Sequence, residues 1–480
     1  MTLQVVPPQC AQDSASNQGD SADDACFDDA SDPGQSSTSY QCSLTGDLDD
    51  DDSWISPQDM ALLKASNPDL GLQPRQQSRL RRLPKGTRPL RLIGEGAANA
   101  VFQLDGAAAA SDLNGLLLRV AKVPSRNHAP TYNYLAQQRF YQTSIKPRLG
   151  EYAVQQELVI LHKSGIVDML NRLLQDIDST RKKKFRGSLI GQTDWGFLVQ
   201  DMRPQDPAEC VLIEFKPKWL SQSPSAPKAS VRCRQCATEL RNLIRDPSGD
   251  RMLPEHKPCP LSLVNKDAPA QVSSPFRIAP HLARDGRSDH FRQVLGTIVN
   301  HPSIRDLKTQ QDLLDKLGPL YAEPTDPFLI AMTLRDCTCF AQIHRRRQSV
   351  KIRMGDFDWK DPLVKFDSWR RAEQELIDGG FYTAERILCN GSYYYPPTFC
   401  VLEFSPGSHG SQPNVLDVQD RDEATVKVGD TSGAEAAGGE VPFSHKADVV
   451  ALQKRLDRFK TTPMSDLAAA LRERLSLSPG

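Results

Sequence analysis

Residues 88–104 read RPLRLIGEGAANAVFQL, two apolar runs separated by a short glycine-containing turn. The turn consists of Gly94, Glu95, Gly96, Ala97, Ala98 and Asn99. Each run has the length and composition of a strand, so the segment predicts a hairpin. A strand–turn–strand of this kind can lie over a nucleotide with its backbone N–H groups facing phosphates. The turn has neither the lysine of a P-loop nor a following helix, which excludes those two phosphate-binding motifs. An ordinary hairpin turn is the alternative interpretation.

The next apolar run, LLLRVAKV at 116–123, predicts a buried strand. It carries Arg119 and Lys122 about twenty residues after the glycine turn. A cation on the strand that follows such a turn reaches the nucleotide phosphates in kinase-like folds. Taken singly, these cations could equally be exposed at a strand end.

Residues 211–218, VLIEFKPK, form a third apolar run that ends in two lysines. Lys216 and Lys218 flank a proline, which restricts the backbone between them. Two cations that leave the same strand end suit a ligand with several phosphates. A generic basic surface loop is the alternative.

Two aspartates follow about twenty residues apart. Asp336 lies in TLRDCT (333–338), and Asp356 follows the predicted strand in VKIRMGDFDWK (350–360), with Lys360 four residues later. In phosphoryl transfer one carboxylate accepts the hydroxyl proton and another holds Mg²⁺ on the phosphates. Asp358 is a possible second metal carboxylate.

Four side chains have a spacing that metal ions favour. Cys233 and Cys236 form a CxxC pair, and His256 and Cys259 form an HxxC pair. Zn²⁺ accepts four such ligands in a tetrahedron. The alternative is that these cysteines are ordinary buried thiols.

Charge and composition exclude several classes of protein. The 480 residues have a net charge of -1, which argues against a uniformly basic nucleic-acid binder. Residues 1–55 hold 12 Asp and no Lys or Arg, so the rest of the chain carries a net charge of +11. Eleven Cys without a signal-like N-terminus favour reduced thiols in the nucleus or cytoplasm. No run approaches the roughly 20 apolar residues of a membrane helix.

The same composition predicts the domain organisation. Residues 1–55 and 405–440 are polar and poor in large apolar side chains, and we expect both to be disordered. The folded body is predicted to be α+β, with a sheet-rich lobe at 56–205, a mixed lobe at 206–404 and a cleft between them. A helical segment at 441–480 is expected to follow.

Several further elements are expected within this body. Ser56 and Pro57 predict the start of a short helix. Helical spacing extends over 155–174, and a second helix at 369–379 should stop at two glycines. Residues 327–343 predict a mixed helix and loop.

Together these motifs resemble the inositol-pentakisphosphate 2-kinase family. In chain order the matching motifs are GEGAAN (94–99), LRVAK (118–122), EFKPK (214–218), CPLSL (259–263), TLRDCT (333–338) and DFDWK (356–360). The combination of EFKPK and RDCT is the specific part, and the insertion-rich form is similar to fungal members. The resemblance implies a two-lobed kinase-like fold. It also implies that ATP and Mg²⁺ are used to phosphorylate the 2-hydroxyl of inositol 1,3,4,5,6-pentakisphosphate, which gives inositol hexakisphosphate (phytate).

The resemblance also implies roles for individual residues. Asp336 would be the catalytic carboxylate and Asp356 the Mg²⁺ ligand. The ATP-binding residues would be Gly94, Glu95, Gly96, Ala97, Ala98, Asn99, Arg119, Gln200, Asp201 and Met202. The substrate-binding residues would be Arg186, Lys216, Lys218, Arg241 and Lys360, with Arg241 in place of a family lysine. Plant members hold zinc in a Cys/His set between the substrate lysines and the catalytic Asp. Residues 260–335 contain no Cys, so that zinc site is expected to be absent.

Two other functions stay open at this point. One is a zinc-stapled adaptor that binds nucleic acid through its basic runs, although these runs lack interleaved aromatic residues. The other is a kinase with a different small-molecule substrate. On the kinase interpretation we expect no membrane or nucleic-acid partner, a location in the nucleus or cytoplasm, and an acidic tail free to bind another protein.

Overall fold

The protein is described from a computed structural model, whose α+β content agrees with the predicted fold class. The described residues are 4–5, 54–66, 80–105, 113–123, 132–247, 254, 257, 259–265, 296–344, 346, 349–404, 414–420 and 444–461. No helix among them is both long and apolar enough to cross a membrane. The chain divides into two compact units, one of Ala22–Ser144 and Gln155–Asp201, the other of Met1–Ser21, Ile145–Val154 and Met202–Gly480.

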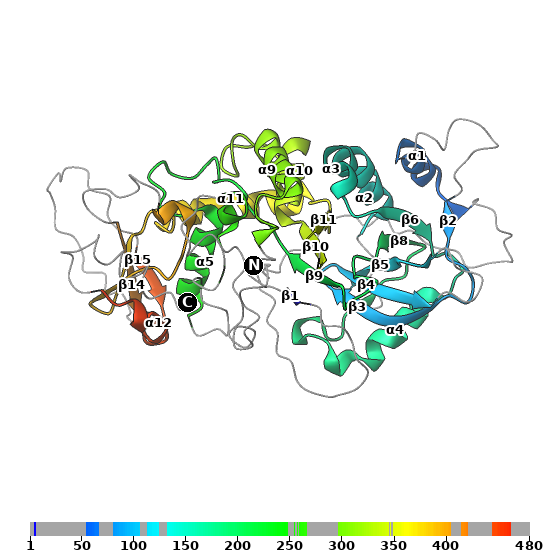
Figure 1. Cartoon of the computed structure of the whole chain (residues 1–480), viewed down its shortest axis with the longest axis horizontal. Coiled ribbons are helices and arrows are strands. Elements are labelled where there is room, and N and C mark those ends of the chain that lie inside the picture. Colours follow the sequence, from blue (N-terminus) through cyan, green and yellow to red (C-terminus); the bar gives the residue numbers. More distant parts are fainter. Residues whose placement is uncertain are drawn as a thin grey trace, which may run out of the picture. The chain divides into compact units, whose positions relative to one another are not determined.

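The unit of Ala22–Ser144 and Gln155–Asp201 is built on one sheet (Figure 1). Its strands are β2 (Arg81–Arg82), β3 (Arg88–Glu95), β4 (Asn99–Asp105), β5 (Leu116–Val123), β6 (Gln156–Ile160), β7 (Leu189–Ile190) and β8 (Trp195–Gln200). The order is β2-β6-β8-β5-β4-β3, with β7 paired to β5. All neighbours are antiparallel except β2 and β6. The glycine turn therefore joins two adjacent antiparallel strands, as predicted.

Helices complete this unit. They are α1 (Pro57–Ser66), α2 (Tyr134–Phe140) and α4 (Ile166–Asp176). The Ser56 hydroxyl accepts a hydrogen bond from Asp59 N (3.0 Å), which confirms the predicted N-cap of α1. Leu170 and Leu174 of α4 are fully buried four residues apart, so one helix face packs into the core beside β3.

The other unit contains two four-stranded sheets. The first has the order β1 (Gln4–Val5), β9 (Cys210–Phe215), β10 (Thr338–His344) and β11 (Val350–Gly355), and all of its neighbours are antiparallel. The second has the order β13 (Ser392–Tyr394), β12 (Arg386–Cys389), β14 (Val415–Asp420) and β15 (Ser444–Ala447).

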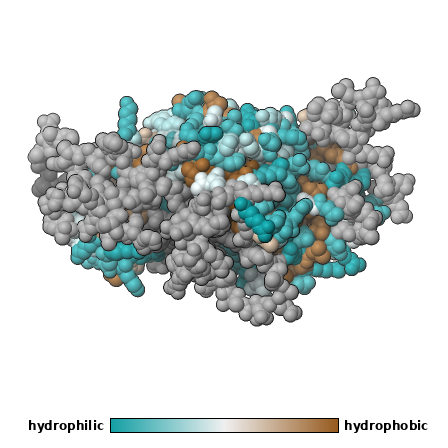
Figure 2. All heavy atoms as spheres, in the orientation of Figure 1, coloured by the Kyte–Doolittle hydropathy of each residue, from teal (hydrophilic) through white to brown (hydrophobic). Residues whose placement is uncertain are grey.

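The helices of this unit are α3 (Lys146–Leu149), α5 (Arg234–Arg245), α9 (Pro302–Leu314), α10 (Asp326–Asp336), α11 (Pro362–Asp378) and α12 (Val449–Leu456). Asp361 caps α11 by accepting a hydrogen bond from Leu363 N at 2.9 Å. The predicted helix at 369–379 is thus part of this longer one. On the face shown in Figure 2, hydrophilic side chains cover most of the described surface, because charged and polar residues are seldom buried.

Three expectations about secondary structure are wrong. Residues 155–174 are not one helix, because 156–160 form β6 and the helix begins only at Ile166. The segment 405–440 is not wholly disordered, since Leu416 and Val418 of β14 are buried between β12 and β15. Gln4 and Val5, expected within a disordered tail, pair with β9. Apolar residues at alternating positions specify β14, and the polar composition around it hid that pattern.

The remaining expectations differ mainly in their boundaries. The loop expected at 327–343 is the strand β10 after α10. The predicted division at 205/206 lies close to the change of unit after Asp201, but 145–154 belongs with Met202–Gly480. Ile55, at the end of the predicted disordered tail, is buried. The segment predicted to be helical from 441 contains the strand β15 before α12. The rest of the predicted tail, residues 405–413 and 421–440, and the helical segment beyond 461 lie outside the described residues.

Candidate active site

Three lysines meet on the carboxylate of Asp336. Lys216 Nζ and Lys218 Nζ each lie 3.2 Å from its Oδ1, and Lys360 Nζ lies 2.9 Å from its Oδ2. Lys216 Nζ also donates to the Asp336 carbonyl oxygen (3.1 Å) and lies 3.6 Å from Asp356 Oδ2. The structure thus brings together five of the residues that the sequence singled out. We call them the lysine–aspartate cluster.

Sheet register explains why these residues meet. Phe215, the last residue of β9, pairs with Cys339 near the start of β10, and Thr338 pairs with Gly355 at the end of β11. Antiparallel pairing therefore places the residues after β9, those before β10 and those after β11 side by side at the same end of the strands. The lysine motif, Asp336 and Asp356 occupy these three positions.

Two residues of the cluster have a left-handed backbone. Lys218 has φ 55° and Asp356 has φ 63°. A β-carbon makes this conformation unfavourable by roughly 1–2 kcal/mol, and such residues concentrate at functional sites. The surrounding contacts must therefore hold both residues in place.

The charges of the three lysines determine the ionisation of Asp336. Burial by itself would raise the pKa of Asp336, but the charges of Lys218, Lys360 and Lys216 outweigh it and hold the pKa well below its usual range. Asp336 is therefore ionised at neutral pH. The cluster carries three ammonium groups and two carboxylates, and the carboxylate of Asp358 lies close enough to act on Lys360. The side chains of its lysines are 20–34% exposed. A ligand with several negative charges fits such a site.

The glycine turn has a different electrostatic arrangement. Glu95 accepts hydrogen bonds from Lys122 Nζ (2.8 Å) and Arg181 Nε (3.1 Å). The three side chains are buried, with exposures of 7%, 3% and 1%. Arg181 also binds the Ser188 carbonyl oxygen at 3.0 Å. The Glu95 side chain is therefore occupied by cations, which leaves the backbone of the turn as the part suited to phosphates.

The other residues predicted to bind ATP are placed as follows. Arg119 is buried on β5, opposite Val101 and Phe197. Gln200 ends β8, and Asp201 N donates to the Gly115 carbonyl oxygen at 2.8 Å. Met202 belongs to the other unit, where its carbonyl oxygen accepts from Gln342 Nε2 at 2.7 Å. The contact of these four residues with ATP stays a prediction.

Two predicted substrate arginines have protein partners. Arg186 donates to the carbonyl oxygens of Arg181 (3.1 Å) and Ser179 (2.7 Å), and its side chain is exposed. Arg241 is buried on α5, where it pairs with Glu375 of α11 at 3.2 Å. Burial lowers the pKa of Arg241, and Glu375 counteracts this. The environment of Arg241 is that of a structural ion pair, so its position does not favour a substrate role.

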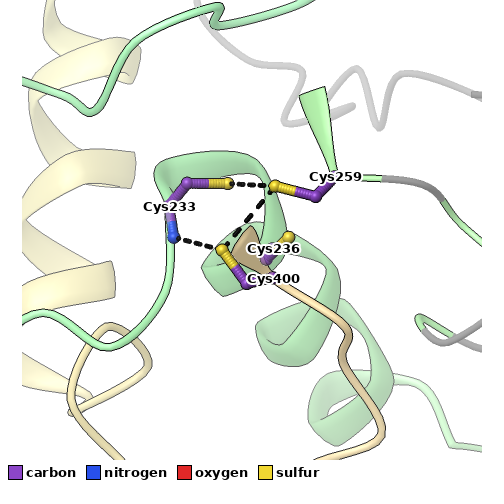
Figure 3. Close-up of side chains that lie close together, drawn as sticks. All are labelled: Cys233, Cys236, Cys259 and Cys400. Atoms are coloured by element: carbon purple, nitrogen blue, oxygen red, sulfur yellow. Dashed lines mark hydrogen bonds between the residues drawn. The ribbon is translucent and has the colours of Figure 1, made fainter. Parts of the chain in front are cut away.

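Four cysteine sulfurs converge in the unit that holds the lysine–aspartate cluster. Cys233, Cys236, Cys259 and Cys400 are buried, and their sulfur atoms lie within 4.8 Å of one another. Figure 3 shows the four side chains pointing toward a common centre from three separate segments. Two sulfur–sulfur distances, Cys233–Cys259 and Cys259–Cys400, are 3.7 Å. His256, the fourth ligand predicted from the sequence, lies outside the described residues.

Comparison with known proteins identifies the family. The model of the inositol-pentakisphosphate 2-kinase family matches residues 93–302 and 281–375. An inositol-pentakisphosphate 2-kinase of Yarrowia lipolytica is 33% identical over 321 residues, which cover 62% of this chain and 94% of the relative. The enzyme of that name from Candida glabrata is 24% identical over 307 residues, covering 59% of this chain and 96% of the relative.

The chain belongs to the inositol-pentakisphosphate 2-kinase family. The matched residues include the glycine turn and the whole lysine–aspartate cluster. They also include Cys233, Cys236 and Cys259, whereas Cys400 lies beyond them. The family resemblance inferred from the motifs is thereby confirmed.

The sequence motifs did not indicate three residues that contact the predicted site residues, namely Arg181, Cys400 and Gln311. Arg181 lies in the basic run RKKK (181–184), which by itself indicates no partner, yet Arg181 pairs with Glu95, 86 positions away. Cys400 is a single cysteine without a spacing motif. Gln311, described below, has no chemical signature in the sequence. Each acquires its contacts only through tertiary folding, so local spacing held no signal for them.

Proposed function

We propose that the protein transfers a phosphoryl group from ATP to the 2-hydroxyl of inositol 1,3,4,5,6-pentakisphosphate, which gives inositol hexakisphosphate. The observation that carries this proposal is the meeting of Lys216, Lys218 and Lys360 on Asp336. A substrate with five phosphates requires several cations in one place, and charge-assisted contacts are roughly twice as strong as neutral ones.

The same cluster supports a role for Asp336 in the chemistry. An inositol hydroxyl is a weak nucleophile, and a carboxylate within hydrogen-bond reach can orient it and accept its proton. In the free protein the lysines hold Asp336 ionised. When substrate phosphates engage these lysines, the positive field at Asp336 weakens and the carboxylate becomes more basic. Substrate binding would in this way prepare the proton acceptor.

Asp356 is suited to hold Mg²⁺. It follows β11 in a left-handed conformation, its side chain is 42% exposed, and it lies beside Lys216. Magnesium prefers oxygen ligands and is usually bound by one or two carboxylates together with substrate phosphates. Bound there, the ion would neutralise negative charge on the transferring phosphates. Asp356→Asn should weaken Mg²⁺-dependent ATP binding, and raised Mg²⁺ should restore part of it. Unchanged Mg²⁺ dependence would exclude this role.

Turnover with a series of acceptors tests the proposed reaction. ATP consumption should require inositol pentakisphosphate and should fall steeply with acceptors that carry fewer phosphates. Equal turnover with inositol itself, or with no acceptor, would contradict a polyanionic substrate. A kinase with another small-molecule substrate would instead prefer a different member of the series.

We also propose that Cys233, Cys236, Cys259 and Cys400 hold a structural Zn²⁺. Zinc binds thiolate sulfur at about 2.3 Å in a tetrahedron, which requires sulfur–sulfur distances of about 3.8 Å. The two 3.7 Å distances agree with this requirement, and they are much longer than a disulfide bond of about 2 Å. The ion would join the start of α5 to the segments around Cys259 and Cys400 (Figure 3).

Metal analysis of the purified protein tests the zinc proposal. We expect about one zinc per chain, retained in Cys210→Ser and lost in Cys400→Ser, together with a lower melting temperature in the latter. Cys210 is a free cysteine on β9 and serves as the control. Metal-free protein of full stability would show that the four residues are only packed thiols.

A further inference from the structure

A buried amide ties together the two backbone segments that carry Lys218 and Asp336. Gln311 of α9 is 1% exposed. Its Nε2 donates to the carbonyl oxygens of Lys218 (3.0 Å) and Leu334 (3.4 Å), and its Oε1 accepts from Leu220 N (3.1 Å). Gln311 therefore links the chain that leaves β9 to the last turn of α10, without taking part in the lysine–aspartate cluster itself.

One of these hydrogen bonds acts on a strained residue. Lys218 has φ 55°, which its β-carbon disfavours. The bond from Gln311 is made to the carbonyl oxygen of this same residue. If the bond is lost, Lys218 can relax toward a more favourable backbone conformation. Its side chain would then leave from a different direction and lose its 3.2 Å contact with Asp336.

Trp219, which follows Lys218, contacts Arg335, which precedes Asp336. The Arg335 guanidinium lies 3.6 Å from the centroid of the Trp219 ring. Arg335 Nη1 donates to Asp315 Oδ2 at 2.6 Å, and Asp315 ends α9 one turn after Gln311. All of these side chains are buried. The end of α9 thus contacts Lys218 of the cluster and the two residues that precede Asp336.

We propose that Gln311 is a positioning residue, which sets the separation between the Lys218 ammonium and the Asp336 carboxylate and so determines affinity for the inositol phosphate. The proposal rests on the function proposed above. ATP binding is assigned to other residues, so its affinity should not depend on Gln311. An effect on affinity for the inositol phosphate without an effect on affinity for ATP distinguishes positioning from a general contribution to stability.

Gln311→Met tests the proposal, because it keeps the length of the side chain and removes its hydrogen bonds. We expect the KM for inositol pentakisphosphate to rise about tenfold, as the loss of roughly one buried hydrogen bond would give, while the KM for ATP is unchanged. KM does not depend on the fraction of protein that is folded. A merely structural role would therefore lower the apparent kcat and leave both KM values as in the wild type.

Three further measurements make the test decisive. Gln310→Met changes the preceding residue of α9, which is only half-buried, and should match the wild type. Gln311→Glu keeps an acceptor for Leu220 N but sets an anion against two carbonyl oxygens, so it should raise the same KM if the Met variant does not fold. Calorimetric titration with inositol hexakisphosphate should show affinity reduced by a similar factor, without any turnover.

The outcomes separate the two proposals. Wild-type protein that transfers no phosphate to inositol pentakisphosphate would end the proposed function, whatever Gln311 does. An inactive Asp336→Asn together with wild-type KM values in the Gln311 variants would overturn the positioning role and leave the function intact. Equal increases in the KM for ATP and for the inositol phosphate would also overturn it.

Discussion

The glycine turn and the lysine–aspartate cluster both combine lysines or arginines with carboxylates, but their side chains differ in exposure. At the turn, the Glu95 side chain is enclosed by Lys122 and Arg181 and all three are buried. In the cluster, three lysines share Asp336 and remain 20–34% exposed. Arg181 also pairs with Asp178 at 2.8 Å, so the first group has two cations and two carboxylates and satisfies its charges within the protein. The second has partly exposed ammonium groups, to which an added anion can bind.

This difference separates a structural ion group from a ligand site better than residue type does. A buried, mutually paired group contributes to stability chiefly because removing one member leaves the others uncompensated. A group whose cations are partly exposed can bind an anion instead. Substitutions in the two regions should therefore alter different quantities, which the following predictions use.

The largest effect is expected at Asp336. Asp336→Asn keeps the shape of the side chain and removes the proton acceptor, so kcat should fall by roughly 10²–10⁴ while ATP affinity is retained. Steady-state kinetics and nucleotide titration with Mg²⁺ provide the two measurements. Loss of ATP affinity in Asp336→Asn with retention in Asp356→Asn would reverse the roles assigned to the two aspartates.

A large effect of another kind is expected at Glu95. Glu95→Ala leaves Lys122 buried without its carboxylate and Arg181 with Asp178 alone, and it should lower the free energy of unfolding by about 3–5 kcal/mol. Denaturant unfolding measures this change. The matched substitution Glu151→Ala, at an exposed position, should change it little. A Glu95 variant as stable as the wild type would contradict the contrast between the two regions.

The lysines of the cluster should affect substrate binding specifically. Lys216→Ala and Lys218→Ala should raise the KM for inositol pentakisphosphate by about 10–100-fold, the loss of one hydrogen bond between charged groups, and change the KM for ATP much less. Lys351→Ala removes the same charge from an exposed position on β11 and serves as the control. Equal effects on both KM values would show that the lysines do not form a substrate site.

The smallest effect concerns pH. Burial would raise the pKa of Glu95, but hydrogen bonds from Arg181 and Lys122 outweigh it and lower the pKa from 4.5. The folded state thus binds the proton more weakly than the unfolded state. The resulting stability is present above about pH 4.5 and is lost as pH falls through the folded-state pKa. Glu95→Gln should therefore lose less stability than the wild type on acidification, as melting temperatures can measure. An identical pH dependence would contradict the assigned pairing.

Much of the site could be predicted from sequence because its parts are local motifs. The glycine hairpin, the strand before Lys216 and the strand before Asp356 each follow from a short apolar run and its ending. The β14 strand could not be foreseen in the same way, because its few apolar residues lie in a polar segment. Arg181, Gln311 and Cys400 depend on contacts between residues far apart in the chain. Their side chains acquire a role only when the fold brings a partner to them.

The position of the new phosphate tests the central claim most directly. The protein is incubated with Mg²⁺, ATP and inositol 1,3,4,5,6-pentakisphosphate, and the product is assigned by phosphorus and proton NMR, with Asp336→Asn as the reference. We expect one added phosphate monoester on the 2-position with the wild type and none with the variant. A pyrophosphate product, a phosphate elsewhere on the ring, or equal product from Asp336→Asn would contradict the account.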